Sequence, residues 1–351
     1  MSKKIKINQL KAGAIISYLQ MAIQILIGLV YTPVMIRLLG QSEYGLYNTV
    51  ASTISILSVL RLGFNNSYIR YYSIYKKRND TKAIDCLNGL FITIFSFIGI
   101  ITFVCGIFLT NHLTIVFSDG LTTSEYGIAR VLMILLTINL AISFPMSVFS
   151  NIISAHEKFV FLKCLEIIKN VLGPMVTLPL LLMGFRSIAM VSVSLIVSLI
   201  TDICYVIYVF LVLKNRFAFN KPEKGLFSDL FAYTVFIAIE LIVDQINWNI
   251  DKVLLARYKG TVMVAIYSVG YSLYTYYQTF SSSISGVFTP RIHKIVNSGT
   301  SIENQRTELT ELFTKVGRIQ FLMLALIASG VVFFGKFFIY KKIFILFTFT
   351  L

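Results

Sequence analysis

Four polar residues recur at helical spacing within the apolar stretch 229–256: Glu240, Asp244, Asn247 and Asp251. At about 100° per residue they share one narrow stripe of a helix. Carboxylates held together in a low dielectric take up protons or share a cation. The stripe therefore predicts uptake of H⁺ or Na⁺, or contact with a substrate. The alternative is structural pairing with basic partners, for which the candidates are Lys252, Arg61 and Arg291.

The apolar stretch 262–288 repeats this spacing with aromatic residues: Tyr267, Tyr271, Tyr274 and Gln278, with Tyr276 and Tyr277 beside them. A tyrosine offers a flat apolar face and a hydroxyl, which suits sugar rings. Packing within a helix bundle is the other interpretation. The first apolar stretch, 12–39, carries a third polar stripe: Ser17, Gln20, Gln24 and Tyr31. We expect the three stripes to face one cavity.

Arg61 is an arginine placed clearly within an apolar run. A diphosphate would be a natural partner, because a guanidinium matches phosphate oxygens bidentately. The alternative is a side chain that extends to the lipid head groups. The sequence has no G-x-x-x-x-G-K-[ST] loop, which argues against direct use of ATP. Transport driven by a gradient is therefore the simplest interpretation, and we expect no enzyme activity.

The elements that carry these residues are long and apolar. Nine stretches have the length of a membrane span: 12–39, 44–64, 84–110, 128–150, 161–184, 188–213, 229–256, 262–288 and 312–335. A helix needs about 20 apolar residues to cross the hydrocarbon core. The ten-residue alternating strands of a membrane barrel are absent from the sequence. We therefore predict an all-α integral membrane protein.

The composition agrees with this class. Of 351 residues, 56% are hydrophobic and only 13% are charged, and the mean hydropathy is +0.79. The formal net charge of +15 could indicate nucleic-acid binding. The basic residues, however, cluster in alternate loops, at 3–11, 70–82, 158–169, 214–224 and 291–318. This distribution follows the positive-inside rule, so we predict a cytoplasmic N-terminus in the cell membrane and no nucleic-acid partner.

The cysteines predict neither a disulfide nor a zinc site. Cys86, Cys105, Cys164 and Cys204 stand singly, without paired spacing. The three histidines also lack a cysteine or carboxylate at ligand spacing. We expect no metal and no cofactor.

The basic loop around Pro222 and Gly225 is the best domain boundary. We predict a six-helix lobe at 1–213, a cytoplasmic linker at 214–227 and a partial second lobe at 228–351. A shift of 220 residues lays Arg37 on Arg257 and Gly40 on Gly260, a weak internal echo. Such symmetry is common in transporters, whose substrate sites lie between the repeated halves.

The second lobe has room for about three spans, so we expect a two-lobed bundle truncated at its C-terminus. The alternative is a natural nine-span protein with a short tail. In a truncated protein the second lobe could not close its side of the cavity, and transport activity would be absent.

Two blocks carry a resemblance to a known family. The first runs from Tyr31 through the "RLLGQSEYGLYN" segment and continues at 62–72, and the second is "DQINWNIDKVLLARYKG" at 244–260, followed by "AIY" at 265–267 and "FTPR" at 288–291. These blocks resemble the oligosaccharide flippases of polysaccharide biosynthesis, the Wzx-type branch of the multidrug/oligosaccharidyl-lipid/polysaccharide exporter superfamily. The resemblance covers residues 5–340.

The resemblance implies a transporter of twelve to fourteen helices that moves undecaprenyl-diphosphate-linked repeat units to the outer leaflet, for capsule, exopolysaccharide or O-antigen synthesis. It also implies polymerase and assembly proteins as partners. The sequence departs from the family in its length and at Arg61, where an acidic residue is common.

Two rival functions share some of these features. A cation-coupled exporter of drugs or small molecules from the same superfamily would share the fold and the acidic helix. A lipid-embedded polymerase or ligase would need long outer loops with paired charged residues, which the sequence lacks.

Overall fold

The computed structural model describes residues 9–61, 64–117, 120–219, 226–296 and 301–347. Within these residues the chain is helical and contains no strand. The elements are α1 (Gln9–Leu39), α2 (Gln41–Ile56), η1 (Leu57–Arg61), α3 (Phe64–Lys77), α4 (Thr81–Asn111), α5 (Leu113–Phe117), α6 (Thr123–Ala155), α7 (Phe159–Leu182), α8 (Ser187–Ile207), η3 (Tyr208–Val212), α9 (Leu226–Lys259), α10 (Thr261–Val296) and α11 (Ile302–Phe347). This architecture confirms the predicted all-α class.

Six helical segments of the described residues are long and apolar enough to cross a membrane: Ile15–Leu39, Thr81–Asn111, Thr123–Ala155, Phe159–Leu182, Ser187–Val212 and Ile302–Gly330. The protein is therefore a multi-pass membrane protein. Predicted spans 229–256 and 262–288 lie in α9 and α10, whose acidic and hydroxyl residues make them more polar than these six.

The predicted span at 44–64 is wrong as a single helix, because α2 gives way to the 3₁₀ segment η1 and then to α3. Just before the change, Ser55 Oγ lies 2.8 Å from the carbonyl oxygen of Ser52.

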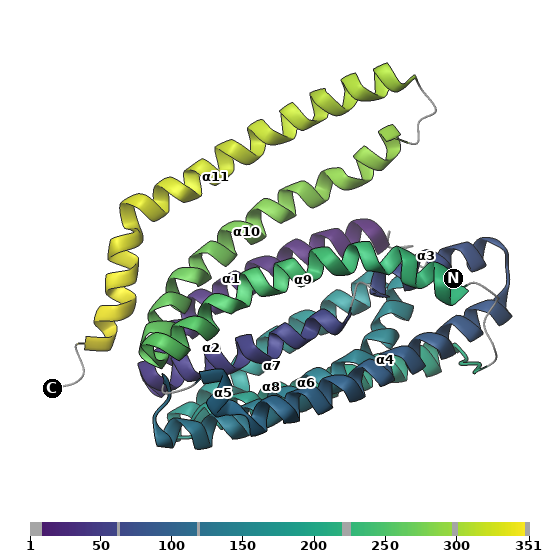
Figure 1. Cartoon of the computed structure of the whole chain (residues 1–351). Helices are drawn as coiled ribbons and strands as arrows, with labels where there is room; N and C mark the ends of the chain where they lie inside the picture. The colour runs from purple at the N-terminus through teal and green to yellow at the C-terminus, as the bar shows by residue number, and fades with distance from the viewer. Residues whose placement is uncertain (1–8, 62–63, 118–119, 220–225, 297–300, 348–351) are drawn as a thin grey trace, which may run out of the picture. The chain divides into compact units, whose positions relative to one another are not determined.

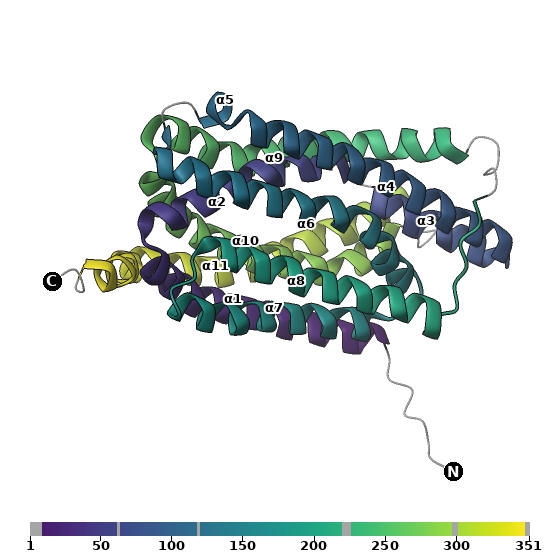
Figure 2. The same cartoon turned by 90° about the horizontal axis from the view of Figure 1, so that it is seen from below.

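The long helices α1, α2, α4, α6, α7, α8 and α9 run roughly along one another in a bundle (Figure 2). α1 packs against α7, α7 against α8, and α8 against α6. α6 in turn packs against both α4 and α2, while α9 lies along α2. α2 is thus an inner element, with helices on both sides.

The turns of this bundle differ between its two ends. At one end, which we call the Gly40 end, three helices follow a glycine with positive φ. Gly40 (φ 80°) and Gly260 (φ 80°) directly precede α2 and α10, and Gly184 (φ 90°) stands three residues before α8. The opposite end, the Asn79 end, has turns with positive φ at Asn79, Glu157 and Lys214. Gly40 and Gly260 are each the single residue between two helices, α1–α2 and α9–α10, as the 220-residue echo predicts.

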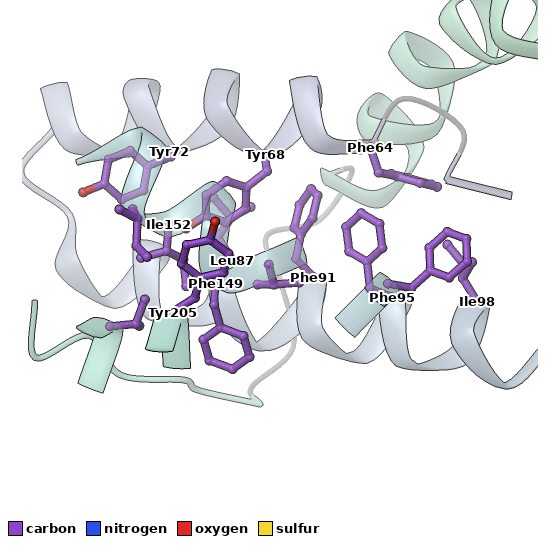
Figure 3. Packing of buried hydrophobic residues seen from close by; sticks show 14 of the residues in the cluster. Phe64, Tyr68, Tyr72, Leu87, Phe91, Phe95, Ile98, Phe149, Ile152 and Tyr205 are labelled. Atoms are coloured by element: carbon purple, nitrogen blue, oxygen red, sulfur yellow. The ribbon is translucent and has the colours of Figure 1, made fainter. Parts of the chain in front are cut away.

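An aromatic core fills the bundle towards the Asn79 end, where α3 packs on α4 and α6 (Figure 3). Tyr68 and Phe91 are fully buried, and their rings meet edge to face with centroids 5.1 Å apart. Phe64 makes a second edge-to-face pair with Phe91, at 6.4 Å. Such pairs add to the stability that apolar burial provides.

Polar contacts hold the segment after η3 against the same core. Tyr68 donates its hydroxyl to Asn88 Oδ1 at 2.7 Å, and Asn88 Nδ2 donates to the carbonyl of Arg216 at 3.0 Å. The backbone N–H of Ala218 donates to the carbonyl of Asp85 at 2.9 Å. Gly89 allows this close approach, because a Cβ there would overlap the carbonyl oxygen of Ala218.

By internal contacts the chain divides into two units, at Met1–Ile266 and Tyr267–Leu351. The first unit includes α9 and the start of α10. The second holds the rest of α10 and α11, which are linked by a hydrogen bond from Gln320 Nε2 to Ser281 Oγ. The predicted lobes at 1–213 and 228–351 stay a prediction about domain organisation, and linker residues 220–225 lie outside the described residues.

Candidate functional site

A polar cavity of about 270 Å³ lies inside the first unit, between α2, α6, α7 and α8. Its lining mixes apolar side chains with hydroxyls, an amide and two opposite charges: Ala51, Ile54, Ser55, Leu136, Asn139, Leu140, Ser143, Lys169, Ser198 and Asp202. Polar groups inside a membrane bundle are costly, and they commonly mark a path or site for a polar substrate. We take this cavity as the candidate functional site.

The two charged residues of the lining come from facing helices. Lys169 lies midway along α7 and Asp202 lies in α8, and both are half-buried. Although both line the cavity, they make no direct ion pair with each other among the described residues. Both charges therefore remain available to a third group.

Arg61, at the end of η1, adjoins this cavity through Ser143. Its Nη2 donates a hydrogen bond to Ser143 Oγ at 3.4 Å, and its guanidinium lies 5.4 Å from the ring centre of Phe144. The Nε atom is buried and has no hydrogen-bond partner. A guanidinium has five N–H groups to donate, so most of the binding capacity of Arg61 is unused within the described residues.

The cavity region thus combines two cations with one carboxylate. Arg61 and Lys169 together exceed Asp202 by one positive charge, and the surrounding serines and asparagine add hydrogen-bond donors. In a low dielectric this imbalance attracts an anion strongly. A bound oxyanion would satisfy the free guanidinium N–H groups and neutralise the excess charge.

α9 contacts the cavity wall through amide side chains. Ser55 Oγ donates to Asn249 Oδ1 at 2.8 Å, and Asn249 Nδ2 donates to Gln245 Oε1 at 2.9 Å. Because Gln245 and Asn249 lie one turn apart, this amide face is turned towards α2. The acidic stripe lies on another face of α9, and its four members, Glu240, Asp244, Asn247 and Asp251, are exposed. Lys252 is half-buried.

The other predicted site residues lie on α1 and α10. In α1, Gln20 and Tyr31 are half-buried and Gln24 is exposed. In α10, Tyr267 and Tyr271 stack with ring centres 5.9 Å apart, and Tyr274 follows at the same distance. Gln278 is exposed. Gln20, Gln24 and Tyr31 are not among the residues that line the polar cavity, and the expectation that the three stripes share one cavity stays a prediction.

Sequence reasoning misses both charged residues of the cavity. The charge pattern places Lys169 in an inner loop, but α7 begins at Phe159 and carries it well inside the bundle. Asp202 does not stand out in the stretch 188–213. The signal is present in both cases, because each is an ionisable residue within an apolar run, as Arg61 is.

Two buried carboxylates at the Gly40 end are also missed. Glu43 accepts hydrogen bonds from the backbone N–H of Ser187 at 2.8 Å and from Ser187 Oγ at 2.6 Å, and Arg186 lies 3.3 Å away. Glu125 forms a capping box with Thr122 at the start of α6. The T-x-x-E spacing of that box is readable in the sequence, whereas the partner of Glu43 is 144 residues distant.

The described residues contain no group of three metal-ligating side chains. The chemistry of the site is therefore that of a polar, partly charged recess in a membrane bundle. This recess, lined by α2, α6, α7 and α8 in a protein with six helices long and apolar enough to cross a membrane among its described residues, is typical of a membrane transporter.

Comparison with known proteins gives the family. Residues 10–296 match the family model "Polysaccharide biosynthesis protein". The chain belongs to this family. No curated protein matches the chain by sequence.

Solved structures of similar fold are transporters. The chain resembles an inward-facing multidrug resistance MATE family transporter of the MOP superfamily, with a TM-score of 0.67 and 13% identity over 94% of this chain and 76% of that one. It also resembles the MATE multidrug transporter DinF-BH, at 0.64 and 14% over 97% and 79%. A MOP superfamily transporter from Pyrococcus furiosus gives 0.58 and 13% over 95% and 73%. The fold is thus that of MOP superfamily transporters.

Proposed function

We propose that this protein moves undecaprenyl-diphosphate-linked oligosaccharide units across the cytoplasmic membrane for the synthesis of a surface polysaccharide. The observation that carries the proposal is Arg61, a half-buried arginine whose buried Nε has no partner, beside a polar cavity that also holds Lys169. A diphosphate supplies the oxygens and the negative charge that this region lacks. Membership of the polysaccharide biosynthesis family supports the same substrate class.

The sugar part of the substrate would contact hydroxyl and amide side chains. Asn139, Ser143 and Ser198 in the cavity offer such hydrogen bonds.

An ion gradient would supply the free energy for this movement. Candidate groups are the exposed acidic stripe on α9 and Asp202 in the cavity, each a carboxylate able to bind H⁺ or Na⁺. The neutralisation of Asp202 by a cation would increase the positive charge that the anionic substrate meets.

A second candidate function is cation-coupled export of a drug or another small molecule. The observation in its favour is the acidic stripe, because exposed carboxylates attract cationic compounds. Two of the similar structures are described as multidrug transporters. The flippase function requires Arg61 for its anionic substrate, whereas the exporter function requires the carboxylate of Asp244 for a cationic one.

The proposal is tested in a strain that lacks its own capsule-unit flippase. Restored surface polysaccharide would overturn the expectation that a truncated second lobe is inactive, and in that background we expect Arg61→Gln to reduce export by about tenfold to a hundredfold, the loss of one or two charged hydrogen bonds. Arg130→Gln, which removes an exposed arginine from α6, is the matched control.

Substitution of Asp244 separates the candidates. If Asp244→Asn abolishes resistance to a cationic compound while Arg61→Gln leaves all phenotypes unchanged, the exporter function stands and the flippase proposal fails. Orientation is tested with cysteines at Thr123 and Lys77, both exposed and at opposite ends. An impermeant thiol reagent should label only Thr123→Cys in intact cells.

A further inference from the structure

The turn between α9 and α10 is fastened to the rest of the first unit at the Gly40 end. Both carboxylate oxygens of Glu125 are occupied there. Oε2 accepts hydrogen bonds from the backbone N–H and the hydroxyl of Thr122, each at 2.8 Å. Oε1 accepts one from Ser42 at the start of α2 and one from Thr261 at the start of α10, the latter at 2.6 Å. One carboxylate thus links the first turns of α2, α6 and α10.

Close backbone contacts at two glycines also hold the turn between α9 and α10. A Cβ at Gly45 would overlap the carbonyl oxygen of Thr261 and lie 3.2 Å from the backbone nitrogen of Ala265. A Cβ at Gly120 would overlap the carbonyl oxygen of Ala256. No side chain therefore separates α2 from the first turn of α10, and Ala265 is only 2% exposed.

The close contact between α2 and α10 covers only the first turns of α10. Thr261, Val264 and Ala265 of the first turns of α10 are buried, while Val262, Met263 and Ile266 are more than 40% exposed. The polar links from Glu125 to α2 and α10 are hydroxyl–carboxylate hydrogen bonds, which can be exchanged for bonds to water.

Glu43 provides a contrast at the same end. Its carboxylate accepts from the hydroxyl and also from the backbone N–H of Ser187, so it satisfies the first turn of α8. These bonds join two helices of the bundle that pack side by side, and none reaches α10. The separation of α8 from Glu43 would leave buried backbone groups without partners.

We propose that Glu125, Ser42 and Thr261 form a latch that holds the Gly40 end of the protein closed and that opens when the site is exposed to that side. The inference rests on the proposed function only in that the protein is a transporter that exposes its site alternately to the two sides of the membrane. The latch fits this role because few, exchangeable bonds and a glycine contact hold α10, and bistable packing of this kind permits discrete opening.

The test measures exposure behind the latch. In a chain with all four cysteines replaced by serine, Ala265→Cys places a thiol at the buried contact between α2 and α10. The protein is reconstituted in lipid nanodiscs, and its labelling by a polar maleimide is timed. We expect slow labelling in this background and an increase of about tenfold or more with Glu125→Ala, because the loss of its two links to Ser42 and Thr261 shifts the equilibrium towards the open form.

Two further variants control the result. Thr261→Val removes one hydroxyl at nearly constant shape and should give a smaller increase, which keeps the test decisive if Glu125→Ala does not accumulate. Glu43→Ala should leave the labelling rate of the folded fraction unchanged. Unchanged labelling with Glu125→Ala overturns the latch. Where that variant does not accumulate, unchanged labelling with Thr261→Val does so. An equal increase with Glu43→Ala also overturns it.

The labelling assay uses no substrate, so it is independent of the substrate class. Arg61→Gln should leave the labelling rate unchanged even where it abolishes export. If Arg61→Gln leaves both export and diphosphate binding unchanged while the labelling pattern is as expected, the flippase proposal fails and the latch remains.

Discussion

The Gly40 end and the polar cavity both contain buried or half-buried charged side chains, but these side chains differ in whether their polar atoms have partners. Glu43 and Glu125 have their oxygens occupied by hydroxyl and backbone donors. Arg61 has a buried Nε without a partner, and Lys169 and Asp202 face a cavity without an ion pair. Satisfied charges hold helices together, whereas unsatisfied charges leave binding capacity for a ligand.

This comparison predicts opposite effects on protein level. Glu43→Ala leaves the Ser187 N–H and hydroxyl without partners, at a cost of about 1–3 kcal/mol for each buried group, so we expect a strong loss of folded protein. Arg61→Ala removes a half-buried, incompletely paired charge and should leave the amount of folded protein unchanged or raise it. For both variants, size-exclusion chromatography of purified protein heated to a series of temperatures measures the fraction that remains folded. Equal destabilisation by the two substitutions would break the comparison.

A second prediction concerns the charge balance of the cavity. Lys169→Met should weaken binding of an isoprenyl diphosphate by about tenfold, because it removes a cation from a low-dielectric site. Asp202→Asn should strengthen the same binding by a few-fold, because it removes a repelling carboxylate of similar shape. Titration of purified protein with the fluorescent diphosphate lipid measures both. Shifts in the same direction would show that electrostatics does not govern the site.

A smaller effect is expected in the aromatic core. Tyr68→Phe keeps the ring against Phe91 but removes the hydroxyl that bonds to Asn88. We expect a loss of about 1 kcal/mol in stability, the value of one hydrogen bond, with export unchanged. A loss of export at normal abundance would place this core in the transport path.

The smallest effect concerns pH. Burial lowers the pKa of His156 below its ordinary value of 6.5; a hydrogen bond to the Ile152 carbonyl opposes this, and the charges of Lys76 and Lys158 add to it. The unfolded chain then binds the proton more readily, so stability should fall slightly as the pH drops below about 6.5. His156→Gln should flatten this part of a stability profile measured between pH 5 and 8. An unchanged slope would exclude His156 as its source.

The fold was largely predictable from the sequence, because apolar length and charge distribution report directly on membrane helices. The break between α2 and α3 was not, since the 3₁₀ segment η1 is as apolar as a membrane helix and leaves no mark in the hydropathy pattern of 44–64. The division of contacts after Ile266 was also beyond reach, because it follows from contacts such as Gly45 against Thr261, 216 residues apart, that leave no periodic pattern.

The site was predictable in part. Arg61 stands out as an arginine inside an apolar run, and the structure places it beside a cavity. Lys169 is misplaced because a basic residue near a loop is read as a loop residue by the positive-inside pattern. The acidic stripe of α9 is recognised by its spacing, but spacing alone does not reveal which face of a helix meets its neighbour, and that face carries Gln245 and Asn249.

The central claim is that the unsatisfied cations of the cavity recognise a diphosphate. The most direct test compares the binding of undecaprenyl diphosphate and undecaprenol to purified protein and to Arg61→Gln in the same detergent. We predict that the protein binds the diphosphate at least about tenfold more tightly, the value of roughly one charged hydrogen bond, and that Arg61→Gln largely removes this preference. Equal affinity for the two lipids, or a preference that Arg61→Gln leaves intact, would contradict the claim.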